Sequence, residues 1–279
     1  MLKGENMYSG LYAPLPSVDT YLERIEMPRP EKLDKDYLDR LIYAHQTHVP
    51  FDTLDVGLLG KDISIDIEDI YNKIVINKRG GYCFEINGLF IKLVQELGYN
   101  AYCVPCRIMP TEETVAPVFH RGSCVVLEGK KYYFDVGGGA MPPGIVEYKE
   151  DEWQDIHGEK FMMKRVGEYW FNLYRLSEES RINNQPKIVL QAGIAEYKPV
   201  DYIAPNIMCG VGPNARFRDR ANLNMRTKNG SVSLTGRELS VVENHQKTVT
   251  VLEDDNEYMD AMKKIFGVDI REEFENLKK

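Results

Sequence analysis

The hydrophobic period of the chain changes near residue 98, and this change limits the fold class more than any other feature. Before it, apolar residues recur at the spacing of helices. After it, from Tyr99 onward, they alternate as in half-buried strands. Helices are predicted over 19–25, 33–48, 67–76 and 83–97, and strands over 101–109, 119–127, 131–136, 158–165, 169–176 and 188–191. Helices followed by consecutive strands predict an α+β fold.

A smaller mixed unit follows the second group of strands. Its expected strands cover 223–227, 232–234 and 247–252, and its helix covers 256–266 and ends at Gly267. The polar segment 177–187 reads as a boundary within the strand-rich part. We therefore expect three parts, namely a helical bundle at 1–98, antiparallel strands at 99–200 and a mixed unit at 201–279.

Charge and composition exclude several classes of partner. The chain carries a formal net charge of −8 and has no lysine- or arginine-rich run, so neither nucleic acid nor a membrane surface is an expected partner. No stretch approaches the ~20 apolar residues that span a bilayer, and residues 1–17 lack the apolar core of a signal peptide. The five cysteines, an odd number without a secretion signal, predict reduced thiols and a cytoplasmic location.

Cys83 is the candidate nucleophile. It stands at the predicted start of the helix over 83–97, where unpaired N–H groups and the helix dipole stabilise a thiolate. Arg79 lies close in sequence, and Gly80-Gly81 allow backbone to approach a reacting group without a Cβ in the way. On local sequence alone, a buried cysteine acting as a small apolar residue is an equal alternative.

A nucleophilic cysteine needs a base, usually a histidine oriented by a third group. The chain has five histidines, which are His45, His48, His120, His157 and His245. His120 opens a predicted strand, and a half-buried imidazole needs a hydrogen-bond partner. Asp135, between apolar neighbours in the next strand, is a candidate because a buried aspartate is rare unless paired.

The expected strand register leaves a gap between these two side chains. A turn at Gly129-Lys130 would place Asp135 opposite Cys124, with His120 about 13 Å away along the strand. A bulge, strand twist or the glycines after Asp135 must then bring the carboxylate to the imidazole.

The pair Cys103 and Cys106 has the CxxC form of redox and zinc sites. It lies within a predicted strand, not at the start of a helix, so a thioredoxin-like role is not expected. A second CxxC and a histidine pair are both missing, so we expect no metal.

Several motifs resemble those of the arylamine N-acetyltransferases. The segment Arg79-Gly-Gly-Tyr-Cys83-Phe-Glu-Ile-Asn87 is similar to the RGGxCxExN signature of that family. The segments 49–55 (VPFDTLD), 134–137 (FDVG) and 213–217 (PNARF) resemble three further family motifs in the same order. The resemblance implies a cysteine-protease-like or transglutaminase-like arrangement, with a helical N-terminal region, an antiparallel β-barrel and a C-terminal α/β lid.

The resemblance also implies a reaction. Cys83 would take the acetyl group from acetyl-CoA, His120 would move protons, and Asp135 would orient the imidazole in a Cys-His-Asp triad. The partners would be coenzyme A and a small aromatic amine or hydrazine, with metabolism of foreign compounds as the setting. No oligomeric state is indicated.

The resemblance extends to residues that bind substrates. Phe51 and Ile108 match positions that line the acceptor pocket, although either could equally be core. Gly138 and Gly139 would let backbone amides approach the coenzyme A pyrophosphate.

Three departures from the family pattern concern the acceptor and coenzyme A. Gly138 replaces an aromatic residue, Phe119 stands where a threonine is common, and 209–212 (CGVG) replaces a segment rich in Ser, Thr and His. The alternative functions are a transglutaminase-like or papain-like thiol hydrolase and a relative that binds ligands without turnover.

Overall fold

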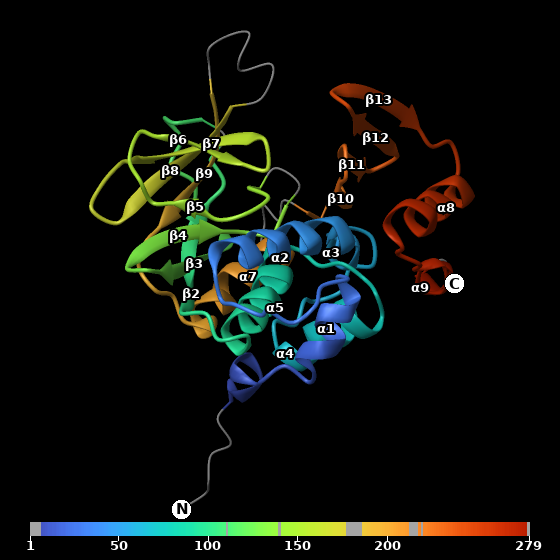
Figure 1. Ribbon diagram of the computed structural model, residues 1–279. Helices are drawn as coiled ribbons and strands as arrows, with labels where there is room; N and C mark the ends of the chain where they lie inside the picture. The colour runs from blue at the N-terminus through green and yellow to red at the C-terminus, as the bar shows by residue number, and fades with distance from the viewer. Residues whose placement is uncertain are drawn as a thin grey trace, which may run out of the picture.

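The computed structural model describes residues 7–109, 111–138, 141–176, 186–211, 217–218 and 220–277. Several positions discussed above lie outside these ranges, namely Gly139, Gly212, 213–216 and 177–185. In Figure 1 the helices of the N-terminal region occupy the lower centre of the molecule, the larger sheet extends along the left and upward, and the C-terminal sheet lies at the upper right with α8 and α9 below it.

The N-terminal region is helical, as its hydrophobic period predicts. Its elements are η1 (Ser9–Tyr12), α1 (Val18–Arg24), α2 (Lys35–His48), α3 (Leu54–Gly57), α4 (Ile67–Tyr71), the π-helix η2 (Asn72–Ile76) and α5 (Cys83–Glu96). Local capping fixes the starts of the first two α-helices. Ser17 accepts a hydrogen bond from the backbone of Thr20, and Asp34 accepts one from the backbone of Tyr37.

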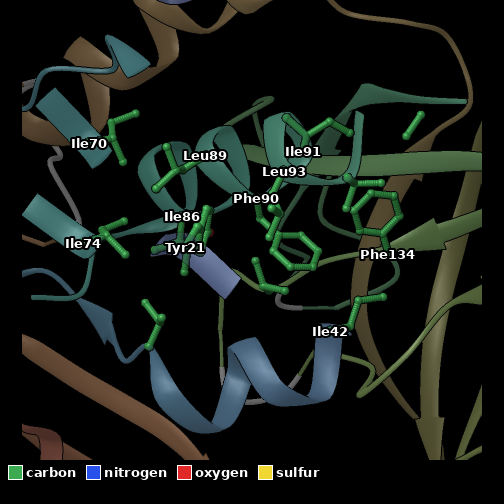
Figure 2. Close-up of a cluster of buried hydrophobic side chains, with 14 of the residues drawn as sticks. Tyr21, Ile42, Ile70, Ile74, Ile86, Leu89, Phe90, Ile91, Leu93 and Phe134 are labelled. Atoms are coloured by element: carbon green, nitrogen blue, oxygen red, sulfur yellow. The ribbon is translucent and has the colours of Figure 1, made fainter. Parts of the chain in front are cut away.

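Helix α5 is the centre of the main hydrophobic core. Figure 2 shows Ile86, Leu89, Phe90 and Leu93 of this helix among side chains from the surrounding elements. Eleven of its fourteen residues are buried, and Gly98 ends it with a positive φ of 109°. Burial of one such large apolar side chain stabilises the fold by roughly 1.5–3 kcal/mol, so the position of Cys83 at the helix start is firmly fixed.

An eight-stranded antiparallel sheet follows. Its strands are β2 (Ala101–Arg107), β3 (His120–Leu127), β4 (Lys130–Phe134), β5 (Val146–Glu147), β6 (Trp153–Ile156), β7 (Glu159–Arg165), β8 (Trp170–Leu176) and β9 (Lys187–Gly193), in the order β5-β4-β3-β2-β9-β8-β7-β6. The two edges approach each other, because the Gln154 side chain on β6 bonds the backbone N–H and C=O of Glu147 on β5. The sheet thus curves into a nearly closed barrel, with α5 packed on β2 and β3.

The remaining chain forms a second sheet with helices beside it. The elements are η3 (Pro199–Tyr202), α7 (Ile203–Val211), β10 (Asn222–Thr227), β11 (Gly230–Thr235), β12 (Glu238–Glu243), β13 (Gln246–Val251), α8 (Asp255–Phe266) and α9 (Arg271–Leu277). This sheet has a fifth strand, β1 (Phe51–Asp52), which comes from the helical region and pairs with β10.

The α+β class and the order of helical region, antiparallel barrel and C-terminal α/β unit are confirmed. The expected helices and strands agree with the structure to within about two residues at most ends. The sequence pattern did not predict β1, β5, β6, β12, α3, α7 or α9. Strands β1 and β5 have only two residues each, too few for an alternating pattern to register. The three-part division at 98 and 200 stays a prediction.

Candidate active site

Cys83 is the first residue of α5 and faces a cavity. Its side chain is buried, yet it lines a cavity of about 300 Å³ together with His120 and Gly137. The helix start is capped by Glu85, whose carboxylate accepts a hydrogen bond of 3.0 Å from the backbone N–H of Tyr82. The thiol therefore lies at the positive end of the helix dipole, which favours its anionic form.

His120 is the first residue of β3, and its ring reaches Asp135. The Nε2 atom of the imidazole lies 2.5 Å from Oδ2 of Asp135, and both side chains are buried. Because Nε2 is engaged by the carboxylate, Nδ1 is the nitrogen left for the thiol of Cys83. Of the five histidines, only His120 lines this cavity.

The register predicted for the β3–β4 hairpin is wrong by two residues. The turn consists of Glu128 and Gly129, both with positive φ (50° and 78°), which is the backbone of a tight two-residue hairpin. Tyr133, not Asp135, consequently pairs with Cys124, and the last pair joins Ser123 to Phe134. Asp135 follows the end of the ladder, two residues closer to His120 than expected.

Asp135 accepts four hydrogen bonds. Its Oδ2 accepts from His120 and from the hydroxyl of Tyr133 (2.5 Å), and its Oδ1 accepts from Asn87 and from the backbone N–H of Gly137 (both 2.7 Å). Burial raises the pKa of this carboxyl, but the imidazole of His120 and these donors outweigh burial and lower the pKa below its usual value. The carboxylate is thus ionised and held in one orientation.

Neighbouring charges also determine the protonation state of His120. Burial lowers the pKa of the imidazole, but the negative charges of Asp135 and Cys83 raise it to about 10. Near neutral pH the ring is therefore a cation beside the ionised carboxylate of Asp135. A cationic imidazole next to a cysteine is the arrangement that nucleophilic thiols use in catalysis.

Asn87 connects the helix to both strands of the site. Its amide nitrogen donates to the backbone carbonyl of Arg121 (2.6 Å) and to Asp135, and its Oδ1 accepts from the backbone of Val136 (2.9 Å). Neither Asn87 nor Tyr133 was among the candidate site residues. Residues two apart in a strand lie on the same face, so Tyr133 shares a face with Asp135. This is the one sequence signal that indicated Tyr133.

Four buried charged side chains and the half-buried Lys73 stabilise the segment that leads into α5; the buried four are Asp52, Asp55, Arg79 and Glu85. Arg79 pairs with Asp52 (3.0 Å) and Asp55 (3.2 Å), and Lys73 pairs with Asp55 and Glu85 (both 2.7 Å). Arg79 thus pairs with acidic neighbours and Glu85 with a basic one, and neither residue lines the cavity.

The glycines around Cys83 are needed for close packing. The sequence suggested that Gly80 lets backbone approach a reacting group. A Cβ on Gly80 would instead lie 2.1 Å from the Pro50 carbonyl oxygen, so the chain there packs against backbone. The glycine that approaches the nucleophile is Gly137, whose Cβ would lie 3.2 Å from Cα of Cys83 and 2.5 Å from Nδ2 of Asn87.

The cavity wall is mostly apolar. Its other described lining residues are Phe51, Ile108, Ala116, Pro117, Phe119, Met208, Cys209 and Phe217. Phe51 and Ile108 both line this cavity, and their contact with an acceptor stays a prediction. Gly138 instead lies in a separate small hollow with Phe51 and Val136, and Gly139 is outside the described residues.

Within the described ranges, His, Cys, Asp and Glu side chains nowhere gather in threes in a way that could hold a metal ion. Helices in the same part of the chain are too short or too polar to cross a bilayer. All five cysteines are free thiols, and Cys103 contacts Arg121 instead of Cys106.

Comparison with known proteins gives consistent matches. The N-acetyltransferase family model matches residues 34–274. The arylamine N-acetyltransferase of Escherichia coli K12 is 30% identical over 206 residues, which cover 73% of this chain and 70% of that protein. The arylamine N-acetyltransferase of Mycolicibacterium smegmatis is 26% identical over 267 residues, covering 90% and 91%. Among solved structures, the Mycobacterium marinum arylamine N-acetyltransferase in complex with CoA superposes with a TM-score of 0.84 at 22% identity, covering 92% and 94%.

Proposed function

The chain belongs to the arylamine N-acetyltransferase family, and on that premise we propose that it transfers the acetyl group of acetyl-CoA to the nitrogen of small aromatic amines or hydrazines. The observation that carries the proposal is that Cys83 and His120 line one apolar cavity and that Asp135 bonds the His120 ring. In this proposal these three residues form the catalytic triad.

The first half of the reaction loads the nucleophile. The Cys83 thiolate attacks the thioester carbonyl of acetyl-CoA, and the negative charge that develops on oxygen is stabilised by backbone N–H groups at the start of α5. Collapse of the intermediate expels the coenzyme A thiolate, which takes a proton from the His120 imidazolium. Acetyl-cysteine and neutral His120 remain.

The second half delivers the acetyl group. The neutral amine attacks the acetyl-cysteine carbonyl while His120 accepts the proton that the nitrogen loses. The Cys83 thiolate leaves, and the pair of thiolate and imidazolium is restored. Asp135 holds the ring in the tautomer with a proton on Nε2 throughout, so Nδ1 carries out both transfers.

The cavity wall suits an aromatic acceptor. Phe51 and Ile108 are proposed to contact its ring, and the apolar surroundings limit the access of water to the thioester. Gly138 and Gly139 are proposed to contact coenzyme A. Five free thiols favour a reducing compartment, so we propose a cytoplasmic enzyme that acts on foreign aromatic amines.

The test is an intact-mass measurement after incubation with acetyl-CoA and no acceptor. We expect a gain of one acetyl group in the wild type and none in Cys83→Ser. Addition of an arylamine should return the wild-type mass to its starting value and release the acetylated amine.

Two outcomes would overturn the proposal. No mass gain, together with thiol-dependent hydrolysis of peptides or amides, would indicate a thiol hydrolase. Binding of coenzyme A without any transfer would indicate a ligand-binding relative without turnover.

A further inference from the structure

Strand β13 forms an open edge of the C-terminal sheet. It is the last strand in the order β1-β10-β11-β12-β13, and Figure 1 shows it as the outermost strand of that sheet. All six of its residues pair with β12 in one regular register, and all six are exposed. Within the described ranges, β12 is the one strand with which β13 pairs. The N–H and C=O groups on its other side therefore face outward.

The other sheet edges are covered within the molecule. At the opposite end of this sheet, β1 bridges Gly81, and the backbone N–H of Asp52 donates to the Gly81 carbonyl (2.9 Å). The edges of the barrel are tied to each other by Gln154 and Glu147. An open edge is a template for pairing with another chain, and proteins usually protect it with proline, a bulge or cover by another element. Strand β13 has neither proline nor bulge.

The residues of β13 favour strand pairing. Positions 248–251 are Thr-Val-Thr-Val, four consecutive β-branched residues of the kind enriched in strands. The side chains of Val249 and Val251 are 49% and 64% exposed. Cross-strand contacts between such side chains stabilise a sheet, so a further strand beside β13 would cover apolar surface that now faces solvent.

The direction of the hydrogen bonds limits the register of such a strand. The N–H of Leu252 donates to the carbonyl of Arg237 (2.9 Å), towards β12. Because this direction alternates along an antiparallel strand, Thr250 also bonds towards β12, whereas Val249 and Val251 point their N–H and C=O groups outward. A second copy related by a two-fold axis at Thr250 would set Val249 opposite its Val251, and the reverse, with backbone bonds in both pairs.

Charge complementarity selects the same register. With the axis at Thr250, Lys247 faces Glu253 of the second copy, and this pair occurs twice. Both side chains are exposed, and neither forms an ion pair with a described residue. Opposite charges across neighbouring strands are stabilising. An axis at Val249 would set Lys247 opposite Val251 instead, and an axis at Val251 would set it opposite a residue of α8, where the chain has left the sheet.

We propose that two copies of this chain associate through β13, antiparallel and centred on Thr250, so that their two five-stranded sheets become one continuous sheet. The interface is isologous, as in most homodimers. It leaves both catalytic cavities accessible, because Phe51 of the cavity wall lies on β1, at the opposite edge of the sheet. One strand from each copy makes a small interface, so the dimer forms reversibly. The proposal does not depend on the proposed acetyl transfer.

The first test is a disulfide at the two-fold axis. In Thr250→Cys the two new thiols lie opposite each other in a non-hydrogen-bonded pair, with Cα atoms about 4.5 Å apart, which a disulfide can bridge. Thr248→Cys is the matched control on the same face, because its two copies are about 13 Å apart along the strands. Copper phenanthroline accepts the two electrons of the oxidation. We expect a covalent dimer on a non-reducing gel for Thr250→Cys alone, since the native thiols are all buried.

The second test exchanges the charges. Sedimentation velocity from low to high micromolar protein measures the Kd of the dimer. We expect Lys247→Glu and Glu253→Lys each to raise Kd about tenfold, because each creates two like-charge pairs. The double variant carrying both changes restores opposite charges and should return Kd to the wild-type value. Lys164→Glu makes the same charge change at an exposed position of β7 and should leave Kd unchanged.

Three results would overturn the inference. The first is a wild-type protein that stays monomeric over the whole concentration range, which would exclude a second copy as the occupant of this edge. The second is a Kd that responds equally to the single and the double charge variants. The third is cross-linking of Thr248→Cys as efficient as that of Thr250→Cys, which would exclude the register. Failure of Cys83 to accept an acetyl group is a separate result, because it contradicts the proposed function and not the dimer.

Discussion

At the scale of single residues, Asp135 has the greatest influence on the site, although it does not line the catalytic cavity. Its four hydrogen bonds connect β3, β4 and α5, and its charge keeps His120 protonated. The reactivity of Cys83 therefore depends on a carboxylate two contacts away.

The first prediction concerns the charge of Asp135. In Asp135→Asn the negative charge is lost, so the pKa of His120 falls from about 10, because burial, which lowers it, is then opposed by Cys83 alone. Wild-type Cys83 should react with iodoacetamide well below the ordinary thiol pKa of ~8.5. At pH 7 the variant should react at least about tenfold more slowly, as followed by mass spectrometry between pH 5 and 9.

Tyr133→Phe is the matched control for that prediction. It removes one hydrogen bond from the same carboxylate and leaves the charge, so its rate should stay within about fivefold of wild type. An alkylation profile of Asp135→Asn that coincides with the wild-type profile would show that the charge does not activate the thiol.

At the scale of elements, the β3–β4 hairpin determines whether the site can form. Lengthening or shortening the turn by one residue would shift the register of the strand and move each of its side chains to the opposite face of the sheet. The turn at Glu128-Gly129 places Tyr133 and Asp135 on the inner side, where both reach the site. The conformation of this two-residue turn thus determines the position of the Asp135 carboxylate.

The second prediction tests the backbone of this turn. A Cβ added to Gly129 or to Gly167 would meet no other atom within 4 Å, but of the two only Gly129 has a positive φ. Gly129→Ala should lower the free energy of unfolding by about 1–2 kcal/mol, whereas Gly167→Ala should change it little. Urea denaturation of both variants measures the difference, and equal values would mean that the turn conformation carries no strain.

Sequence patterns predicted the elements of the site better than their contacts. The stripe of apolar residues over 83–97 defined α5, and the shortage of other suitable histidines indicated His120. The contact to Asp135 could not be derived, because periodicity locates a strand but not the turn type that sets its register. Asn87 was missed for a related reason, since its three partners belong to other elements of the fold.

At the scale of the whole molecule, two buried histidines affect stability in opposite ways. Burial lowers the pKa of His45 to about 3, with the charges of Arg24 and His48 acting in the same direction. The pKa of His120 is raised to about 10. His120 therefore stabilises the fold fully below pH ~6.5 and loses this contribution as the pH rises towards 10.

The third prediction concerns the acid side of the stability profile. The unfolded chain binds a proton at His45 below pH ~6.5, whereas the folded chain does not until about pH 3. Folding should thus lose about 2 kcal/mol between pH 7 and pH 5 from this group. His45→Gln preserves a polar partner for Tyr21 and does not titrate, so urea unfolding at both pH values should show a smaller loss. An identical loss in wild type and variant would contradict the assignment.

The pairing of β1 with β10 has a consequence for synthesis of the chain. Phe51, which forms one wall of the catalytic cavity, lies in β1, and the neighbouring Thr53 bonds Asn222, 169 residues further along. Contacts this distant in sequence form late, after most of the chain has left the ribosome. During translation Cys83 emerges long before its pocket can close, so the nascent protein depends on the reducing power of its surroundings to keep that thiol intact.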